Sequence, residues 1–383
     1  MFAKSDKISH IPLTKSIFIN TDGFTCNAEC MKRLLDEGKI FSFMAHYNGS
    51  LDELNYMRSE FAYYQRVFRV FEDEEYSIRV AMLIPQKSIR RYALTTVNSV
   101  LAYLLSKQHD FEVKVFNSHD ESEESILREL ENIKKENFRY VIAPLTKKGA
   151  KVILENEDNL VIYIPTINKE TLEQSSSNIV FGGISYKEQI DELFRYTNDR
   201  VAYFTDGSNL SKELNDLLVE KTQNIVYSKN IRNSRMNFKQ MLKKNKKLIN
   251  SSIFMNTPLV KTSLIASQLR VYEIEPYVLL STQINYNPML LTLTQFEDRK
   301  EFFIANSIGG TTVEMVEINS LFEHDIVYDW VNYSTSIGMD YFYTNYFVPT
   351  ANSNFDEDII ENQIKYNISI VKPKRNKFEK ELF

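Results

Sequence analysis

Apolar residues in this chain fall into two successive series of short runs, each run followed by a longer amphipathic stretch. The first series opens with an apolar run at 79–84 that ends at Pro85, and the stretch 88–107 then carries apolar residues at helical spacing on one face. A short apolar run followed by helical periodicity is typical of a strand and its crossover helix. The pattern therefore predicts βα units around a parallel sheet.

The same unit repeats along the rest of the chain. Within 77–178 we predict strands at 112–116, 140–143 and 160–164 and helices at 123–136 and 148–154. A polar, serine-rich break at 171–178 ends this series. In the second series we predict strands at 201–204, 224–227, 252–255 and 277–280 and helices at 211–221, 237–247 and 259–269.

These two series predict an α/β fold of two lobes, each a parallel sheet flanked by helices. We assign 77–178 to the first lobe and 179–285 to the second, and we expect part of 286–350 to complete the first lobe. A strand at 302–305 would return to the first lobe, followed by an aromatic-rich helix at 327–347. The C-terminal segment 351–383 would hold a strand at 361–371 and a frayed basic tail at 372–380.

Residues 1–76 follow a different pattern and are expected to form an N-terminal α/β appendage. It would hold a short strand at 16–20, a helix at 29–37 that ends at Gly38, and a longer helix at 50–70. Ser50 precedes acidic residues and can therefore cap the longer helix.

The order of these elements resembles the type I periplasmic binding protein superfamily, which includes branched-chain amino-acid receptors and the activator lipoproteins of penicillin-binding proteins. The resemblance covers about 77–347 and rests on the stretches 79–85, 140–146, 160–165, 179–185, 201–207 and 237–242. It implies a two-lobed fold with a hinge around Gly182 and Gly183, and a periplasmic location. Residues 1–6 lack the apolar core of a signal peptide, so the numbering of an exported protein would begin after signal removal.

In that superfamily the ligand contacts loops at the carboxyl ends of the strands, where helix amino ends also present free N–H groups. The resemblance therefore nominates as candidate cleft residues Gln86, Lys87, Ser88, Thr146, Thr166, Asn168, Asp206, Ser208, Asn256, Thr257, Ser281 and Thr282. Each of them also fits the description of an ordinary polar loop residue.

One loop departs from the pattern of the amino-acid receptors. Those receptors hold the ligand carboxylate with small residues in the loop after the third strand, whereas this chain has bulky or charged residues at 144–148. The chain also has only ten glycines, so close backbone approach to a ligand is rarely possible. A free amino acid is therefore not the expected ligand.

Charge is unevenly distributed along the chain. The formal net charge of −5 is small for 383 residues and argues against nucleic-acid binding. However, no Asp or Glu occurs between Lys221 and Tyr272, a tract rich in Lys and Arg. This tract is either a solvated lysine-rich face or a docking surface for an anionic partner, with candidate contact residues Lys239, Lys243, Lys244, Lys246 and Lys247.

No apolar run is long enough to span a bilayer.

The sequence has no motif for catalysis or for cofactor binding. The glycine-rich dinucleotide and phosphate loops and the nucleophile elbow are absent, and the five histidines have no metal-ligand spacing. Cys26 and Cys30 fit a disulfide, two free thiols, or a zinc site with His46 that lacks a fourth ligand. We expect the disulfide in an exported protein, and no metal, no cofactor and no enzymatic activity.

The expected function is that of a non-catalytic envelope protein that uses the receptor fold to bind a macromolecular partner, itself an envelope protein. The alternative is a solute-binding receptor for a small polar ligand that feeds a transporter or sensor. An α/β enzyme of flavodoxin-like or glycosyltransferase-like architecture would need an acidic metal motif or a cofactor loop, and the sequence has neither.

Overall fold

The computed structural model describes residues 26–47, 55–68, 78–107, 109–156, 159–232 and 237–381. The chain divides into two compact units. One comprises Met1–Ile78 with Leu104–Glu112, and the other comprises Arg79–Tyr103 with Val113–Phe383. The second unit contains most of the two predicted lobes.

The described part of the N-terminal unit is helical, with α1 (Ala28–Asp36), α2 (Ile40–His46) and α3 (Asn55–Phe68). Their apolar core contains Met31, Phe43, Met44 and Met57. The Asn27 side chain caps α1 by accepting a hydrogen bond from the Cys30 amide, and Gly38 adopts the left-handed conformation after the helix. The predicted helix at 29–37 is thus confirmed. The predicted strand at 16–20 and the Ser50 cap lie outside the described residues.

The first lobe is built on a sheet with seven described strands in the order β11-β12-β5-β4-β3-β1-β2. They are β1 (Ile78–Leu83), β2 (Phe111–Phe116), β3 (Tyr140–Ile142), β4 (Val161–Ile164), β5 (Ile179–Phe181), β11 (Asp358–Ile360) and β12 (Gln363–Lys365). The inner strands pair in parallel, as in Val80 with Tyr140 and Ile162 with Ile179. Strand β11, at the edge of the described sheet, pairs antiparallel with its neighbour β12.

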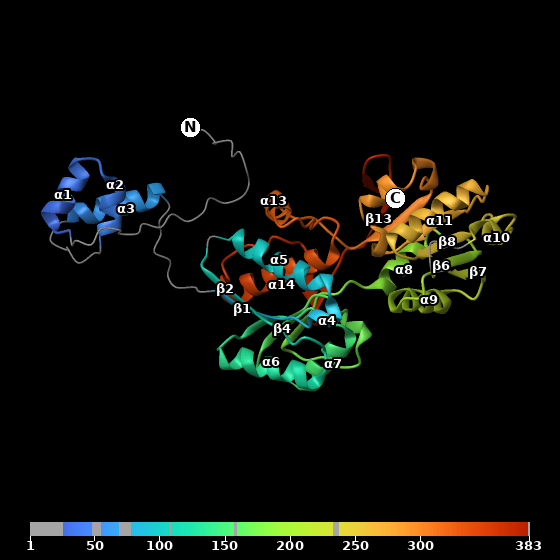
Figure 1. Cartoon of the computed structure of the whole chain (residues 1–383), viewed down its shortest axis with the longest axis horizontal. Helices are drawn as coiled ribbons and strands as arrows, with labels where there is room; N and C mark the ends of the chain where they lie inside the picture. Colours follow the sequence, from blue (N-terminus) through green and yellow to red (C-terminus); the bar gives the residue numbers. More distant parts are fainter. Residues whose placement is uncertain are drawn as a thin grey trace. The chain divides into compact units, whose positions relative to one another are not determined.

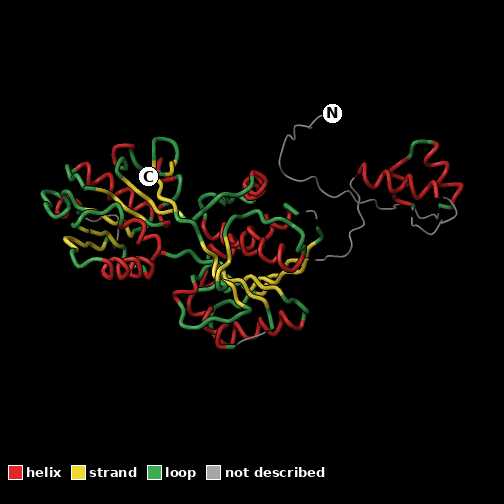
Figure 2. The backbone as a smooth tube through the Cα atoms, turned by 180° about the vertical axis from the view of Figure 1, so that it is seen from behind, coloured by secondary structure: helices red, strands yellow, loops and turns green. Residues whose placement is uncertain are grey.

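Helices cover both faces of this sheet (Figure 1). One face carries α5 (Arg91–Leu105) and α14 (Trp330–Phe342), and the other carries α6 (Glu123–Lys135) and α7 (Lys147–Glu155). The view from behind separates the same helical layers from the strands (Figure 2). Shorter elements of this lobe are α4 (Gln86–Ile89), η1 (Lys169–Thr171), α13 (Val313–Leu321) and η4 (Tyr343–Phe347).

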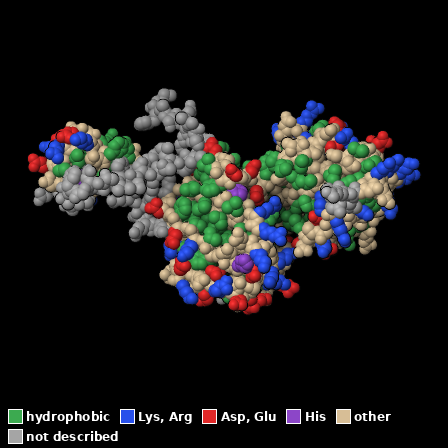
Figure 3. Space-filling view, viewed as in Figure 1, with side chains coloured by type: hydrophobic (Ala, Val, Ile, Leu, Met, Phe, Trp, Pro, Cys, Tyr) green, Lys and Arg blue, Asp and Glu red, His purple; other side chains and the backbone are tan. Residues whose placement is uncertain are grey.

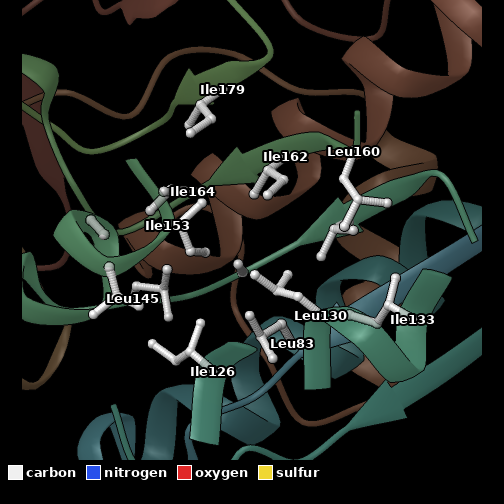
Figure 4. Packing of buried hydrophobic residues seen from close by; sticks show 14 of the residues in the cluster. Leu83, Ile126, Leu130, Ile133, Leu145, Ile153, Leu160, Ile162, Ile164 and Ile179 are labelled. Atoms are coloured by element: carbon white, nitrogen blue, oxygen red, sulfur yellow. The ribbon is translucent and has the colours of Figure 1, made fainter. Parts of the chain in front are cut away.

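Isoleucine and leucine side chains fill the layer between the sheet and α6 (Figure 4). Ile126, Leu130 and Ile133 recur at helical spacing on α6, and none is more than 2% exposed. They belong to one buried cluster with Leu83 and Ile162 from the strands, and Leu83 lies beside Leu130. Complete burial of each such side chain contributes about 1.5–3 kcal/mol to stability, so this layer fixes the first lobe.

The second lobe has the same plan. Its described sheet has seven strands in the order β14-β13-β10-β9-β8-β6-β7. They are β6 (Val201–Thr205), β7 (Ile225–Asn230), β8 (Ser252–Asn256), β9 (Val278–Ser281), β10 (Phe302–Asn306), β13 (Ser369–Pro373) and β14 (Phe378–Lys380). The helical elements are α8 (Tyr186–Phe194), α9 (Asn209–Lys221), α10 (Phe238–Leu242), α11 (Leu259–Val271), η2 (Gln283–Asn285), α12 (Met289–Leu293) and η3 (Phe296–Asp298). Two lobes, each a mostly parallel sheet flanked by helices, confirm the predicted fold class.

Two strands lie in a different lobe from the one that the sequence pattern predicts. The strand predicted at 302–305 for the first lobe is β10, which pairs with β9 and β13 in the second sheet. Conversely, the run 179–181, which the pattern places in the second lobe, forms β5 and pairs with β4 in the first sheet. A buried apolar run looks alike in either sheet, because its pattern encodes burial and not the identity of its neighbour.

The predicted helix at 237–247 is shorter than expected. Helix α10 ends at Leu242, and 243–250 forms turns in which Lys244 and Asn250 adopt positive φ values of 63° and 52°. Lysine favours helices, but Asn245 hydrogen-bonds from its side chain to the Met241 carbonyl and accepts from the Lys247 amide, which favours a turn.

The C-terminal segment contributes to both sheets. The alternating run predicted as one strand at 361–371 is two strands, β12 in the first sheet and β13 in the second. The basic tail predicted to fray is also ordered, because β14 pairs antiparallel with β13. Alternation alone cannot show where a strand leaves one sheet and enters another.

Candidate functional site

The candidate residues of the first lobe lie at the carboxyl edge of its sheet. Gln86 and Lys87 are exposed on α4, and Ser88 is half-buried beside them. Gln86 accepts a hydrogen bond of 3.2 Å from the Asn117 side chain, and the Lys87 amide donates to the His119 carbonyl. These contacts tie α4 to the loop after β2.

The amino end of α7 is occupied by a carboxylate of the chain itself. Glu121 is 4% exposed, and its Oε1 accepts a hydrogen bond of 2.6 Å from the Thr146 amide. The Thr146 hydroxyl donates to the other oxygen of the same carboxylate. A β-carbon on Gly149 would lie 2.8 Å from Glu121 Oε1, so a larger residue there would displace the carboxylate. Glu121 is not among the residues that the sequence pattern indicated. Its only signal was an acidic residue in the loop after a predicted strand.

Thr166 and Asn168 also hold loops together at this edge. The Thr166 hydroxyl accepts from the Leu145 amide over 2.9 Å and donates to the Leu145 carbonyl. The Asn168 side chain donates to the Gly183 carbonyl over 3.1 Å and caps η1 by accepting from the Glu170 amide. Both side chains are therefore engaged within the first lobe.

In the second lobe, Asp206 and Ser208 follow β6 at the carboxyl edge of the sheet. Ser208 caps α9, and the Asp206 carboxylate accepts from the Ser208 amide over 3.0 Å. Burial opposes ionisation, but the hydrogen bonds from Ser208 and Ser211 and the Lys261 ammonium, 3.5 Å away, lower the pKa of Asp206. This carboxylate is thus charged at neutral pH and paired with a cation.

The remaining candidates of the second lobe are buried and cross-linked. Asn256, Thr257, Ser281 and Thr282 are at most 1% exposed. Asn285 of η2 links two of them, because its side-chain amide donates to Ser281 Oγ over 2.8 Å and to the Thr257 carbonyl over 3.2 Å, while the Asn256 amide donates to Asn215. The side-chain oxygens Asn256 Oδ1, Thr282 Oγ1 and Asn285 Oδ1 are buried and have no hydrogen-bonding partner among the described residues. These oxygens could accept hydrogen bonds from a polar molecule.

All five lysines of the proposed partner surface are exposed. Four of them, Lys243, Lys244, Lys246 and Lys247, lie in the turns that lead into β8, and Arg200 fixes these turns by hydrogen bonds to two of their carbonyls. None of the five has an ion-pair partner within the described ranges. Figure 3 shows Lys and Arg side chains at the end of the second lobe that holds α10, among other places on that lobe. The turns precede β8, so they lie at the opposite edge of the sheet from Asn256.

Three segments connect the sheets, 182–185, 307–312 and 366–368, and two hydroxyl groups donate hydrogen bonds to the first of them. Ser334 of α14 donates towards the Gly182 carbonyl over 2.8 Å, and Tyr366 also donates to that carbonyl. A β-carbon on Gly182 would lie 2.0 Å from the Tyr163 hydroxyl oxygen. Glycine at 182 is therefore required by close packing with these hydroxyls.

Three further observations concern the cysteines, metal binding and membrane-spanning helices. Cys26 and Cys30 form a disulfide with a Cα–Cα distance of 5.4 Å, which is one of the three states that the sequence left open. Across the described ranges, no group of three or more His, Cys, Asp or Glu side chains is arranged to hold a metal ion. In the same ranges no helix combines the length and apolar character needed to cross a membrane.

No protein-family model matches the chain, and no curated protein matches it. Solved structures do match. A leucine-binding protein from Thermotoga maritima superposes with a TM-score of 0.55 at 14% identity, over 80% of this chain and 98% of that protein. The C-domain of LpoA from Haemophilus influenzae, described as a regulator of PBP1A, superposes with a TM-score of 0.51 at 10% identity. The match covers 79% of this chain and 100% of that domain. A longer LpoA structure from Haemophilus influenzae superposes with a TM-score of 0.54 at 8% identity, over 92% of this chain and 71% of that one. At such identities the likeness concerns the fold alone, and the chain has the type I periplasmic-binding-protein fold.

Proposed function

We propose that this chain is a non-catalytic binding protein of the bacterial envelope that binds a protein partner. Its contact surface is the basic surface of the second lobe, formed by Lys239, Lys243, Lys244, Lys246 and Lys247. The observation that carries the proposal is the Glu121 carboxylate at the amino end of α7.

The Glu121 carboxylate argues against capture of a free amino acid. In the amino-acid receptors that this chain resembles, the loop after the third strand holds the carboxylate of the ligand. Here the amide and hydroxyl of Thr146 in that loop already bind a buried internal carboxylate. A second carboxylate would meet like charge and find these two donors engaged, which disfavours its binding.

The basic surface favours a macromolecular partner. Lysines without acidic partners at one end of a lobe create a positive potential that attracts an anionic surface and raises the association rate. Because these lysines lie at the edge of the sheet opposite Asn256, a partner can bind there whatever occupies the carboxyl edge.

The fold comparisons are compatible with both a receptor and a regulator. The longer LpoA structure matches 92% of this chain, a larger share of the chain than the two lobes form. The leucine-binding protein matches 80%. The Cys26–Cys30 disulfide fits an oxidising compartment such as the periplasm.

A second candidate function is a receptor for a small polar ligand. It is favoured by the buried oxygens of Asn256, Thr282 and Asn285 that have no partner among the described residues. Such acceptors suit a ligand that carries hydroxyl or ammonium donors. A ligand that binds only the folded state would raise the melting temperature, which a screen of polar metabolites measures.

The proposal is tested by crosslinking in cells, with the full chain carrying Lys243, Lys244, Lys246 and Lys247 changed to Glu. We expect capture of the envelope partner to fall by about tenfold or more, because the surface charge is reversed. The matched control carries the same charge change at Lys135, Lys148, Lys151 and Lys212, which are exposed elsewhere. Equal loss of capture in both variants, or loss in neither, would refute the basic surface as the contact.

A further inference from the structure

The segment 307–312, which connects β10 to α13, is held by one tyrosine and one carboxyl group. Tyr333 of α14 is 1% exposed, and its hydroxyl oxygen lies 2.6 Å from Glu357 Oε1 and 3.1 Å from the Gly310 carbonyl oxygen. A β-carbon on Gly309 would lie 2.6 Å from the same carboxyl oxygen. Glycine at 309 thus allows the carboxyl group to approach the connecting segment.

The number of protons decides which of these hydrogen bonds can form. A tyrosine hydroxyl has one proton, and here two acceptors are within reach of it. When Glu357 is ionised, its charged oxygen is the stronger acceptor. The Tyr333 hydroxyl then donates its hydrogen bond to Glu357, so the Gly310 carbonyl loses its donor. When Glu357 is protonated, its own O–H can donate to the tyrosine oxygen, which leaves the tyrosine proton for Gly310.

The second carboxyl oxygen favours the protonated state. Glu357 Oε2 is buried and has no hydrogen-bonding partner among the described residues. A buried charged oxygen without a partner is strongly destabilising, whereas a neutral carboxyl group loses much less on burial. The geometry therefore favours a neutral Glu357 independently of the hydrogen bond to Tyr333.

The titratable groups that face Glu357 do not reverse this preference. They are Tyr333 of α14, Asp356 of the same loop, Tyr163 of β4 and Tyr366 after β12. Burial raises the pKa of Glu357 and is the largest influence on it, and the charge of Asp356 acts in the same direction. The Tyr333 hydrogen bond and the backbone amides of Glu357 and Asp356 oppose this shift without reversing it. Burial also raises the pKa of each of the three tyrosines, so these remain neutral while Glu357 titrates.

We propose that Glu357 and Tyr333 form a proton-dependent latch on the segment 307–312. The neutral carboxyl group lets Tyr333 fasten Gly310, and ionisation of the carboxyl group releases it. The sign follows from linkage. A carboxyl group whose pKa is raised in the folded state binds more protons in that state than in the unfolded state. The free energy of unfolding therefore falls as pH rises from the pKa of the unfolded state towards the pKa of the folded state. The connection between the sheets therefore loosens as pH rises.

Hydrogen exchange of the amides in 307–312 tests the latch on the full chain. After correction for the intrinsic exchange rate, we expect protection to fall by about fivefold or more between about pH 5 and about pH 8. Glu357→Gln keeps a donor facing Tyr333 and should retain high protection at both pH values. The control Asp358→Asn, at an exposed carboxylate in β11, should behave like the wild type.

A second variant and a direct titration cover the case in which Glu357→Gln does not fold. Tyr333→Phe lacks the hydroxyl, so its protection in 307–312 should be low at both pH values. The carboxyl carbon of Glu357, followed by NMR, should titrate above the ordinary value of about 4.3 for glutamate. The proposal is overturned if Glu357→Gln keeps the pH dependence of the wild type, or if the carboxyl group titrates at or below that ordinary value.

Discussion

The hydroxyl of Tyr163 donates a hydrogen bond to the carbonyl oxygen of Ser334 over 2.8 Å. Tyr163 lies in β4 and Ser334 in α14, and both side chains are fully buried. The Ser334 hydroxyl in turn lies 2.8 Å from the Gly182 carbonyl at the end of β5. The chain therefore enters the second lobe from a point that is fixed to the core of the first.

Replacing Gly182 by alanine should destabilise the first lobe. The added β-carbon would lie 2.0 Å from the Tyr163 hydroxyl oxygen and 2.4 Å from Ser334 Oγ, so both hydroxyls would have to move. We expect a loss of about 2 kcal/mol or more in the free energy of unfolding by urea. Gly310→Ala is the matched control, because a β-carbon there meets nothing within 4 Å. A G182A variant as stable as G310A would contradict the packing.

Removal of the Glu121 carboxylate should open an anion site. In Glu121→Ala the Thr146 amide and hydroxyl lose their acceptor, which should cost about 2 kcal/mol. Acetate or formate should then raise the melting temperature of this variant more than chloride does at equal ionic strength, while the wild type responds equally to all three. Glu220→Ala, at an exposed glutamate on α9, should resemble the wild type. If acetate acts on all three proteins alike, Glu121 does not fill an anion site.

Periodicity was sufficient to predict the βα units but not the sheet to which each strand belongs. Burial makes β5 and β10 read alike, and their positions depend on pairing with β4 and β9. Helix α10 ended early because Asn245 forms local side-chain hydrogen bonds that compete with the helix. The pairing of β14 with β13 is likewise a tertiary contact that the basic composition of the tail obscured.

The candidate site could be predicted only in outline. Strand order placed Thr146 and Asn256 at carboxyl edges because parallel strands share one direction. It could not identify Glu121 or Glu357, because each meets its partner across a distance in sequence: 25 residues from Thr146 and 24 residues from Tyr333. Such contacts depend on the path of the loops, which hydrophobic periodicity does not encode.

Asp298 should make the second lobe sensitive to acid. Its carboxylate binds Arg270, the Ser267 hydroxyl and the Gln295 amide. Burial opposes ionisation, but these hydrogen bonds outweigh it and lower the pKa of Asp298. The stabilisation is therefore fully present at pH values above the pKa of about 3.9 that Asp has in the unfolded state. It is lost as pH falls through the lower pKa that Asp298 has in the folded state.

The variant Asp298→Asn measures this contribution. It should lower the free energy of unfolding by about 2 kcal/mol at neutral pH, and the difference from the wild type should shrink below about pH 4. Asp199→Asn, at an exposed aspartate of the same lobe, serves as the control. A difference that stays constant from neutral to acidic pH would show that Asp298 acts by packing and not by charge.

The most direct test of the proposed function is the dissociation constant of the purified full chain for the envelope protein captured in cells. Affinity should weaken as salt increases, because the surface lysines act through long-range charge. Reversal of Lys243, Lys244, Lys246 and Lys247 to Glu should weaken binding by about tenfold or more, with the melting temperature unchanged because these side chains are exposed. Unchanged affinity in that variant, together with a small polar metabolite that raises the melting temperature of the wild type by several degrees, would contradict the account and favour the receptor function.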